Sequence, residues 1–165
     1  AMDPLLSSFP SCKTERLRIR PLILEDAALV AVLTDDPTIT NAVHFLPSPF
    51  TFSGAQALID SKDAENCFLG VWLGAELIGV VGMHAHGDDR LEVGYWIGSR
   101  FHRRGYAAEA VSAVISQLRR TYPARLITAE CRRGNEASWS LLHKLGFRSI
   151  GERGNRPGRE LLAIE

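Results

Sequence analysis

The residues best suited to chemistry in this chain lie at positions 102–110, between a strand-like run and a helical pattern. They read His-Arg-Arg-Gly-Tyr-Ala-Ala-Glu-Ala and follow residues 91–97, which have the composition of a strand. Apolar residues then recur at helical spacing and would form one buried face: Ala107, Val111, Val114, Ile115 and Leu118. At a helix N-terminus, unpaired backbone N–H groups and the positive end of the helix dipole point at one place. Gly105 allows close approach to the backbone and Arg103 and Arg104 add positive charge, so the sequence predicts a site for a phosphorylated ligand.

An ordinary turn with two surface arginines is the alternative to this interpretation. Two other segments favour the ligand site. Residues 14–22 read Thr-Glu-Arg-Leu-Arg-Ile-Arg-Pro-Leu, and residues 135–147 contain Asn-Glu-Ala-Ser and then Leu-Leu-His-Lys-Leu-Gly-Phe. In this order and spacing, the three segments resemble the GNAT superfamily of acyl-coenzyme A N-acyltransferases, and within it the Rim-type branch of ribosomal-protein N-terminal acetyltransferases. The resemblance extends from about residue 14 to about residue 151.

The resemblance implies acetyl-coenzyme A (acetyl-CoA) as co-substrate and no metal. The superfamily pattern at the turn is Gln or Arg, two residues, Gly, one residue, then Gly or Ala. Gly105 and Ala107 match this pattern, and His102 occupies its leading position. The backbone N–H groups of residues 103–108 would bind the pyrophosphate. The residues implied to contact the cofactor are Tyr95, Trp96, Ile97, His102, Arg103, Arg104, Gly105, Tyr106, Ala107, Ala108 and Asn135.

Gly94 interrupts the strand at residues 91–97, where a glycine indicates a bulge or a close approach to the backbone. In the GNAT fold this strand diverges from the next one, and the amide groups of pantetheine pair with its backbone. The resemblance therefore implies that residues 95–97 offer backbone groups to the cofactor. A simple bulge is the alternative.

Glu92 is the predicted general base. It alternates with Gly94 and Trp96, on the opposite side from Leu91 and Val93. An amine that is protonated at neutral pH must lose a proton before it attacks a thioester, directly to a base or through water. Burial against Trp96 is expected to raise the pKa of Glu92, and Rim-type enzymes have a glutamate at the matching position. An exposed strand glutamate, or a partner for Arg90, is the alternative.

Ser138 matches the Rim-type residue that assists departure of the thiolate. Many GNAT enzymes use a tyrosine later on this helix, but the corresponding residue here is Leu142. A serine that only supports the helix cap at Asn135 is the alternative. Cys131 is left out of the catalytic set, because a buried cysteine usually acts as a small apolar residue.

The expected activity is transfer of an acetyl group to a primary amine by direct attack. A protein or peptide N-terminal α-amine is the favoured acceptor, and a small-molecule amine (antibiotic, polyamine or amino acid) is the alternative. A non-catalytic module that binds acetyl-CoA is a further alternative. His44, Phe45 and Trp96 are the predicted acceptor-binding residues, with Phe50 and Phe52 nearby.

Length and composition predict one domain over residues 1–165 with a substantial core, because 45% of the 165 residues are hydrophobic. A formal net charge of zero disfavours a nucleic-acid-binding protein. Three cysteines at wide spacing favour reduced thiols and a cytoplasmic location. We expect no membrane span, no signal peptide, and a monomer or homodimer. His84 and His86 have no third ligand at a matching spacing, so no metal site is expected.

The predicted fold class is α/β (α+β), a GNAT fold with a mixed, splayed sheet of six to seven strands and helices on both faces. The expected strands cover residues 17–21, 67–73, 77–83, 91–97, 126–131, 147–151 and 161–164. Helices are expected over 24–33, 37–43, 53–64 with Ser53 as N-cap, 106–121, and 136–145 between Asn135 and Gly146. Residues 1–13 are expected to be a loose segment, and residues 1–4 an expression remnant, since Ala1 precedes Met2.

Overall fold

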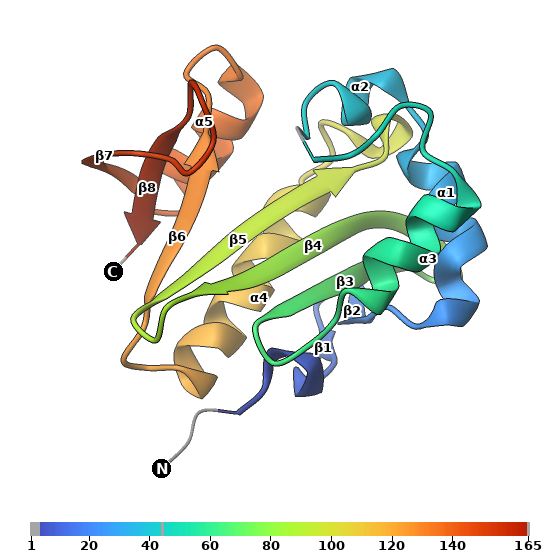
Figure 1. Cartoon of the computed structure of the whole chain (residues 1–165), viewed down its shortest axis with the longest axis horizontal. Helices are drawn as coiled ribbons and strands as arrows, with labels where there is room; N and C mark the ends of the chain where they lie inside the picture. The colour runs from blue at the N-terminus through green and yellow to red at the C-terminus, as the bar shows by residue number, and fades with distance from the viewer. Residues whose placement is uncertain (1–3, 44, 165) are drawn as a thin grey trace.

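A single eight-stranded sheet organises the chain in the computed structural model, which describes residues 4–43 and 45–164. The strand order is β1-β2-β3-β4-β5-β6-β8-β7, and every neighbouring pair is antiparallel except β5 and β6 (Figure 1). The strands are β1 (Cys12–Lys13), β2 (Arg18–Pro21), β3 (Asn66–Leu73), β4 (Glu76–His86), β5 (Arg90–Ile97), β6 (Leu126–Cys131), β7 (Arg148–Arg153) and β8 (Glu160–Ile164). The mixed sheet confirms the predicted fold class, and the short β1 is the strand that the prediction of six to seven strands omitted.

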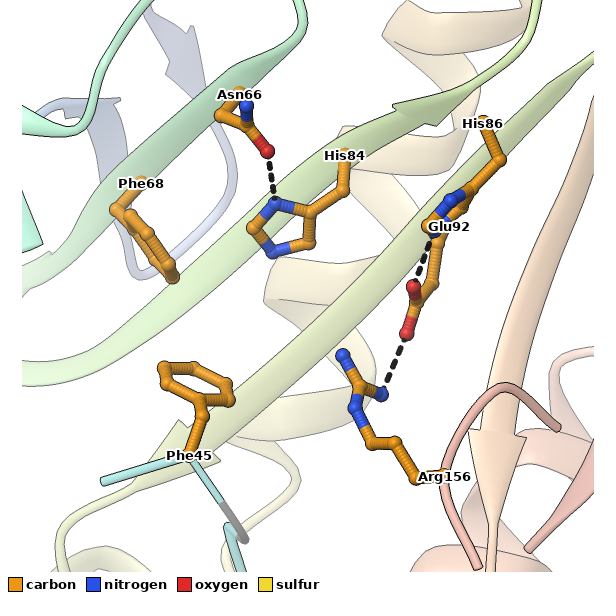
Figure 2. Close-up of a pocket in the computed structure, with 7 residues that line it drawn as sticks. All are labelled: Phe45, Asn66, Phe68, His84, His86, Glu92 and Arg156. Atoms are coloured by element: carbon orange, nitrogen blue, oxygen red, sulfur yellow. Dashed lines mark hydrogen bonds and ion pairs between the residues drawn. The ribbon is translucent and has the colours of Figure 1, made fainter. Parts of the chain in front are cut away.

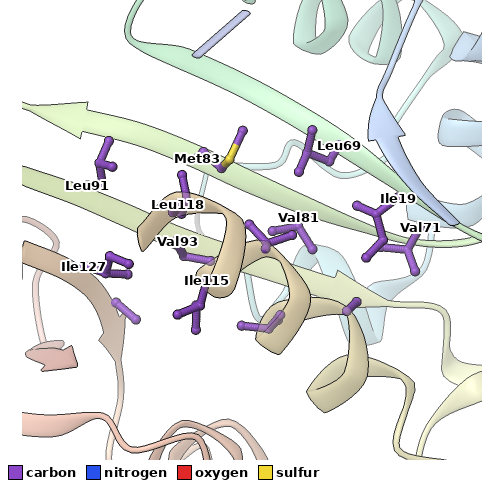
Figure 3. Close-up of a cluster of buried hydrophobic side chains, with 14 of the residues drawn as sticks. Ile19, Leu69, Val71, Val81, Met83, Leu91, Val93, Ile115, Leu118 and Ile127 are labelled. Carbon is purple, nitrogen blue, oxygen red and sulfur yellow. The ribbon is translucent and has the colours of Figure 1, made fainter. Parts of the chain in front are cut away.

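Helices cover both faces of the sheet, as predicted. The helix α4 (Tyr106–Thr121) packs on one face, where side chains of alternate strand residues form the larger core cluster (Figure 3). The other face is covered by α1 (Ala27–Thr34), α2 (Pro37–Thr40) and α3 (Phe52–Asp60), which enclose a second cluster. The remaining α-helix is α5 (Glu136–Lys144). The short 3-10 helices are η1 (Leu6–Ser8), η2 (Leu24–Asp26) and η3 (Ser99–Phe101). Along β5 the two clusters alternate, with Leu91 and Val93 facing α4 and Trp96 facing the other side.

The strands β5 and β6 separate after a short parallel ladder. They pair only from Arg90–Glu92 to Leu126–Thr128, and beyond this point they diverge (Figure 1). The strand β6 continues through Cys131 with β8 as its partner. The splay expected from the sequence is therefore present, and it begins at Glu92.

Several local features confirm the sequence predictions and others correct them. The side chain of Asn135 caps α5 by accepting a hydrogen bond from the Ser138 backbone N–H, and Gly146 has a φ of +103°, as expected of a helix C-terminal glycine. The predicted N-cap at Ser53 is wrong: Thr51 caps α3 by accepting from the Gly54 N–H. Both residues are good caps by type, so composition alone did not distinguish them.

The first thirteen residues differ from the expected loose segment in the part that the structure describes. Leu6 and Phe9 are buried in the larger core cluster, and β1 adds an edge strand to the sheet. Apolar side chains therefore attach this segment to the domain. Across the described residues, none of the helices is long and apolar enough to cross a membrane.

Candidate active site

The turn before α4 has the backbone geometry of an anion-binding site. Arg103 and Gly105 have positive φ angles of 63° and 81°, so the chain reverses sharply before the helix begins at Tyr106. Within residues 4–43 and 45–164, the backbone N–H groups of residues 103–108 donate to no other group. Six free donors at the positive end of a 16-residue helix form a cradle for negatively charged oxygens.

Side chains around the cradle fix its shape. The Nε2–H of His102 donates to the Ile97 carbonyl over 2.8 Å, which ties the turn to the end of β5. His102, at the leading position of the pattern, therefore holds the turn in place although the residue is exposed. Arg103 and Arg104 are also exposed, so their side chains are accessible to a ligand.

A second anchor joins the cradle to the N-terminal strands, and the sequence analysis missed it. Arg16 donates from Nε to Glu109 over 2.7 Å and from Nη1 to the Arg104 carbonyl over 3.0 Å, and its guanidinium lies 4.4 Å from the centroid of the Tyr106 ring. Thr14 Oγ1 donates to the other oxygen of Glu109 over 2.5 Å. Burial raises the pKa of Glu109, but these hydrogen bonds outweigh burial and hold the pKa below its ordinary value. Thr14 and Arg16, at the start of the segment 14–22, therefore support the cradle.

One side-chain contact joins β5 to α5, the helix that follows β6. The Tyr95 hydroxyl on β5 lies 3.1 Å from Ser138 Oγ on α5. Burial raises the pKa of Tyr95 to about 12, against the opposing effect of this hydrogen bond. Tyr95 is therefore a neutral hydroxyl at physiological pH, which can donate to Ser138 or to a ligand.

Gly94 lies in the same divergent region, but the bulge considered for it is absent. The β4–β5 register runs through Gly94 without a shift, and a Cβ at this position would meet nothing within 4 Å. The backbone of residues 95–97 lies beyond the last β5–β6 pair, on the edge that faces the splay. The resemblance implies cofactor contacts along this edge, where the Ile97 carbonyl already accepts from His102 Nε2.

The side chain of Trp96 has a different environment from the one predicted. It is buried in the second core cluster, and its Nε1–H donates to Thr34 Oγ1 over 3.1 Å. Its ring makes an edge contact with Phe45 at 6.1 Å between centroids, but it does not line the neighbouring pocket. Trp96 therefore supports the pocket wall through Phe45 and does not line the pocket.

A pocket of about 310 Å³ lies on the sheet face opposite α4, beside the start of the splay (Figure 2). Its side chains come from five elements or loops, and they are Phe45, Asn66, Phe68, His84, His86, Glu92 and Arg156. A second cavity, of about 210 Å³, shares His86 and Glu92 with the first and is also lined by Thr128 and Glu130 of β6. Glu92 therefore lies between the pocket and the diverging strands.

Glu92 is buried and has two charged or polar partners. Its Oε1 accepts from His86 Nε2 over 2.6 Å, and its Oε2 accepts from Arg156 Nη1 over 2.8 Å. Burial raises the pKa of Glu92, but the bond from His86 and the charge and hydrogen bond of Arg156 outweigh burial and lower the pKa below its ordinary value. The prediction of a raised pKa is wrong, because Arg156 lies 64 positions away in sequence and gives no local signal.

The other predicted acceptor residues have separate locations. Phe45 lines the pocket and contacts the Phe68 ring at 6.1 Å between centroids. Phe50 is buried in the second core cluster, and Phe52 is exposed on α3. His44 lies outside the described residues.

Five of the seven pocket residues were not assigned from the sequence: Asn66, Phe68, His84, His86 and Arg156. Strand alternation was the available signal for His84, since it lies directly opposite Glu92 in the β4–β5 register and so faces the same side. Among the described residues no group of three or more His, Cys, Asp or Glu side chains could hold a metal ion. Cys12, Cys67 and Cys131 are free thiols.

The structure combines an amide cradle at the start of a helix, a parallel strand pair that splays beside it, and a polar pocket where the splay begins. Residues 16–148 match the family model described as an acetyltransferase (GNAT) domain. The chain therefore belongs to the GNAT acetyltransferase family.

Relatives agree with this assignment. The chain is 31% identical over 164 residues to an uncharacterised N-acetyltransferase, YoaA, of Bacillus subtilis, covering 87% of this chain and 85% of YoaA. It is 30% identical over 148 residues to the uncharacterised N-acetyltransferase p20 of Bacillus licheniformis, with 84% and 82% covered. This chain is thus an acetyltransferase enzyme by family.

Solved structures share the fold. A GNAT-family acetyltransferase of Bacillus anthracis superimposes with a TM-score of 0.80 at 24% identity, covering 94% of this chain and 98% of its own. The microcin C7 self-immunity acetyltransferase MccE, in complex with acetyl-CoA and AMP, gives a TM-score of 0.78 at 16% identity over 91% and 92%. The ribosomal L7/L12 α-N-protein acetyltransferase RimL, in complex with coenzyme A, gives 0.78 at 15% identity over 93% and 97%. The fold is therefore one that accommodates acetyl-CoA and includes Rim-type enzymes.

Proposed function

We propose that this enzyme transfers the acetyl group of acetyl-CoA to a primary α-amine, with a protein or peptide N-terminus as the favoured acceptor. The observation that carries the proposal is the position of Glu92. It lies at the last β5–β6 pair and lines both the pocket and the cavity at the diverging strands. An acceptor in the pocket and a thioester between the strands would meet beside it.

The cofactor residues proposed from the resemblance fit the chemistry of coenzyme A. The free amides of residues 103–108 suit pyrophosphate oxygens, and the exposed Arg103 and Arg104 add positive charge. The free edge at residues 95–97 suits the amides of pantetheine. Bound acetyl-CoA supplies an activated thioester, and the chain's own part is to hold it and to orient the amine.

Two side chains take the catalytic roles next to this junction. Glu92 keeps its negative charge at neutral pH, because its pKa is lowered, and so favours positive charge on groups in the pocket. Ser138, whose hydroxyl shares a hydrogen bond with that of Tyr95, is placed to hydrogen-bond the departing thiolate. Coenzyme A has a thiol pKa of about 8.5 by analogy with cysteine, so weak assistance is sufficient.

The basicity of the acceptor favours an α-amine over an alkyl amine. An α-amine has a pKa of about 7.7–8.0 and a lysine amine about 10.4, so only the former is substantially neutral at physiological pH. The aromatic walls Phe45 and Phe68 suit a small apolar side chain next to that amine.

One contact favours a small-molecule amine as the second candidate acceptor. Arg159 Nη2 donates to the Ala42 carbonyl over 2.9 Å. This bond joins the β7–β8 loop, which carries Arg156, to the segment after α2, which carries Phe45. Both segments line the pocket, so the bond limits how far the two walls can separate around a peptide.

The test is thiol release from acetyl-CoA with a panel of acceptors, followed by mass spectrometry of the products. The panel pairs short peptides having free α-amines with the same peptides blocked at the N-terminus, and includes amino-acid amides and polyamines. We expect release with free α-amines and none with blocked peptides. Turnover of polyamines or lysine side chains alone would contradict the proposed acceptor, and absence of release with every amine would contradict the activity.

A further inference from the structure

A chain of hydrogen bonds fixes the protonation of the His84 ring. Asn66 Nδ2 donates to Asp63 Oδ1 over 3.1 Å, which orients the Asn66 carbonyl oxygen towards His84. That oxygen lies 2.9 Å from His84 Nδ1 (Figure 2). An amide oxygen can only accept, so Nδ1 carries the hydrogen and, in the neutral ring, Nε2 carries the lone pair.

The lone pair of His84 is available to a molecule in the pocket. Among the described residues, Nε2 has no hydrogen-bond partner. The ring lies against the edge of Phe68 at 5.2 Å between centroids, and a Cβ at Gly82 would come within 3.0 Å of Nε2. A glycine at this position of β4 therefore leaves the space around Nε2 open.

The neighbouring groups are less available as proton acceptors. Both oxygens of Glu92 accept hydrogen bonds, from His86 and from Arg156. His86 directs its Nε2 towards Glu92 instead of into the pocket. Of the three, His84 alone combines a fixed tautomer with an unoccupied nitrogen.

We propose that His84 Nε2 is the proton acceptor in acetyl transfer, which rests on the proposed function. The amine nitrogen forms a bond to the acetyl carbon while the C–S bond of the thioester breaks. The amine proton passes to Nε2, and the thiolate finally takes up one proton from His84 through solvent. The products are the amide and the free thiol, and His84 returns to its neutral form.

The charged surroundings of His84 are consistent with this role. The strand β3 presents the neutral Asn66, β4 presents His86, β5 presents Glu92, and the β7–β8 loop presents Arg156. Burial lowers the pKa of His84; Glu92 raises it, and Arg156 and His86 lower it, so the result lies below the ordinary value of about 6.5. The ring is therefore neutral at pH 7, and the part of the pH profile that belongs to the enzyme should fall as pH decreases through this lowered pKa.

The experiment compares the dependence of kcat on pH in four proteins: wild type, His84→Gln, Asn66→Asp and Glu92→Gln. Two acceptors with different amine pKa values separate the ionisation of the enzyme from that of the substrate. We expect the wild type to lose activity at a pH below about 6.5, with both acceptors alike. His84→Gln should lose about 10²–10⁴-fold in kcat and lose this acidic limb, while its KM for acetyl-CoA stays unchanged.

Asn66→Asp keeps the size of the side chain and places a carboxylate beside Nδ1. It should raise the pKa of His84 and move the acidic limb to higher pH. A thermal shift induced by acetyl-CoA checks that each variant is folded. An acidic limb that persists in His84→Gln, or one that disappears in Glu92→Gln alone, would overturn the proposal while leaving the proposed function intact. Absence of acetyl transfer by the wild type would refute both.

Discussion

Replacing Gly105 by alanine tests whether the cradle needs a left-handed residue with no side chain. Gly105 has a φ of +81°, and a Cβ there would lie 3.3 Å from Arg16 Nη2. A left-handed conformation costs an L-residue about 1–2 kcal/mol. Gly134→Ala is the matched control, because Gly134 has no positive φ and its Cβ would meet nothing within 4 Å.

Both variants restrict the unfolded chain equally, so that contribution cancels in the comparison. The two should then differ by the strain alone, about 1–2 kcal/mol, which corresponds to about 2–8 °C in Tm for a domain of this size. Calorimetry measures the Tm, and titration with acetyl-CoA measures Kd. The methyl group of Gly105→Ala occupies space next to the free amides, so its Kd should rise while that of Gly134→Ala stays at the wild-type value. Equal Tm and equal Kd in the two variants would refute the assigned role of this turn.

Three further substitutions test the junction and the pocket. Because the pKa of Glu92 is lowered on folding, its contribution to stability is present above the unfolded pKa of about 4.3 and is lost as pH falls through the folded pKa. At pH 7, Glu92→Gln should therefore be less stable than wild type by about 1–3 kcal/mol, because Arg156 loses its anionic partner. The variant should also lose less stability than wild type when the pH is lowered. Urea denaturation measures both differences. Tyr95→Phe removes the hydrogen bond to Ser138 and should cost about 0.5–1.5 kcal/mol of stability. It should also lower kcat more than it changes the KM for acetyl-CoA. An unchanged kcat would show that this hydrogen bond has no part in catalysis. Phe45→Ala should raise the KM for the acceptor and leave the Kd of acetyl-CoA unchanged, as steady-state kinetics and calorimetric titration would measure, whereas an equal effect on both would contradict a wall of the acceptor pocket.

The parts of the fold that sequence predicted are those determined by neighbouring residues. Helical spacing of apolar residues identified the buried face of α4, and alternation along β5 correctly separated Glu92 and Trp96 from Leu91 and Val93. The Asn135 cap depends on contacts within a few positions and was also confirmed. Local periodicity and capping carry this information because they depend on backbone geometry alone.

The parts that sequence missed depend on contacts between distant segments. The environment of Glu92 depends on Arg156, which reaches it from the β7–β8 loop, and the tautomer of His84 depends on Asn66 in another strand. Neither contact can be inferred without the order and register of the strands. The sequence correctly predicted that Glu92 is buried. The predicted rise of its pKa was wrong, because Arg156 and His86 lower the pKa in the folded chain.

The short parallel ladder between β5 and β6 has a consequence for cooperativity. The unit formed by β6, β8 and β7 is joined to the rest of the sheet by pairing over three residues of each strand. Side-chain bonds from Arg90 to Glu152 and from Arg156 to Glu92 add to this connection. Segments with few shared backbone bonds open at a lower free energy than the whole domain unfolds. The C-terminal unit is therefore the part of the molecule whose amide hydrogens should exchange by partial opening, and a ligand bonded to both strand edges would merge it with the remainder into one unfolding unit.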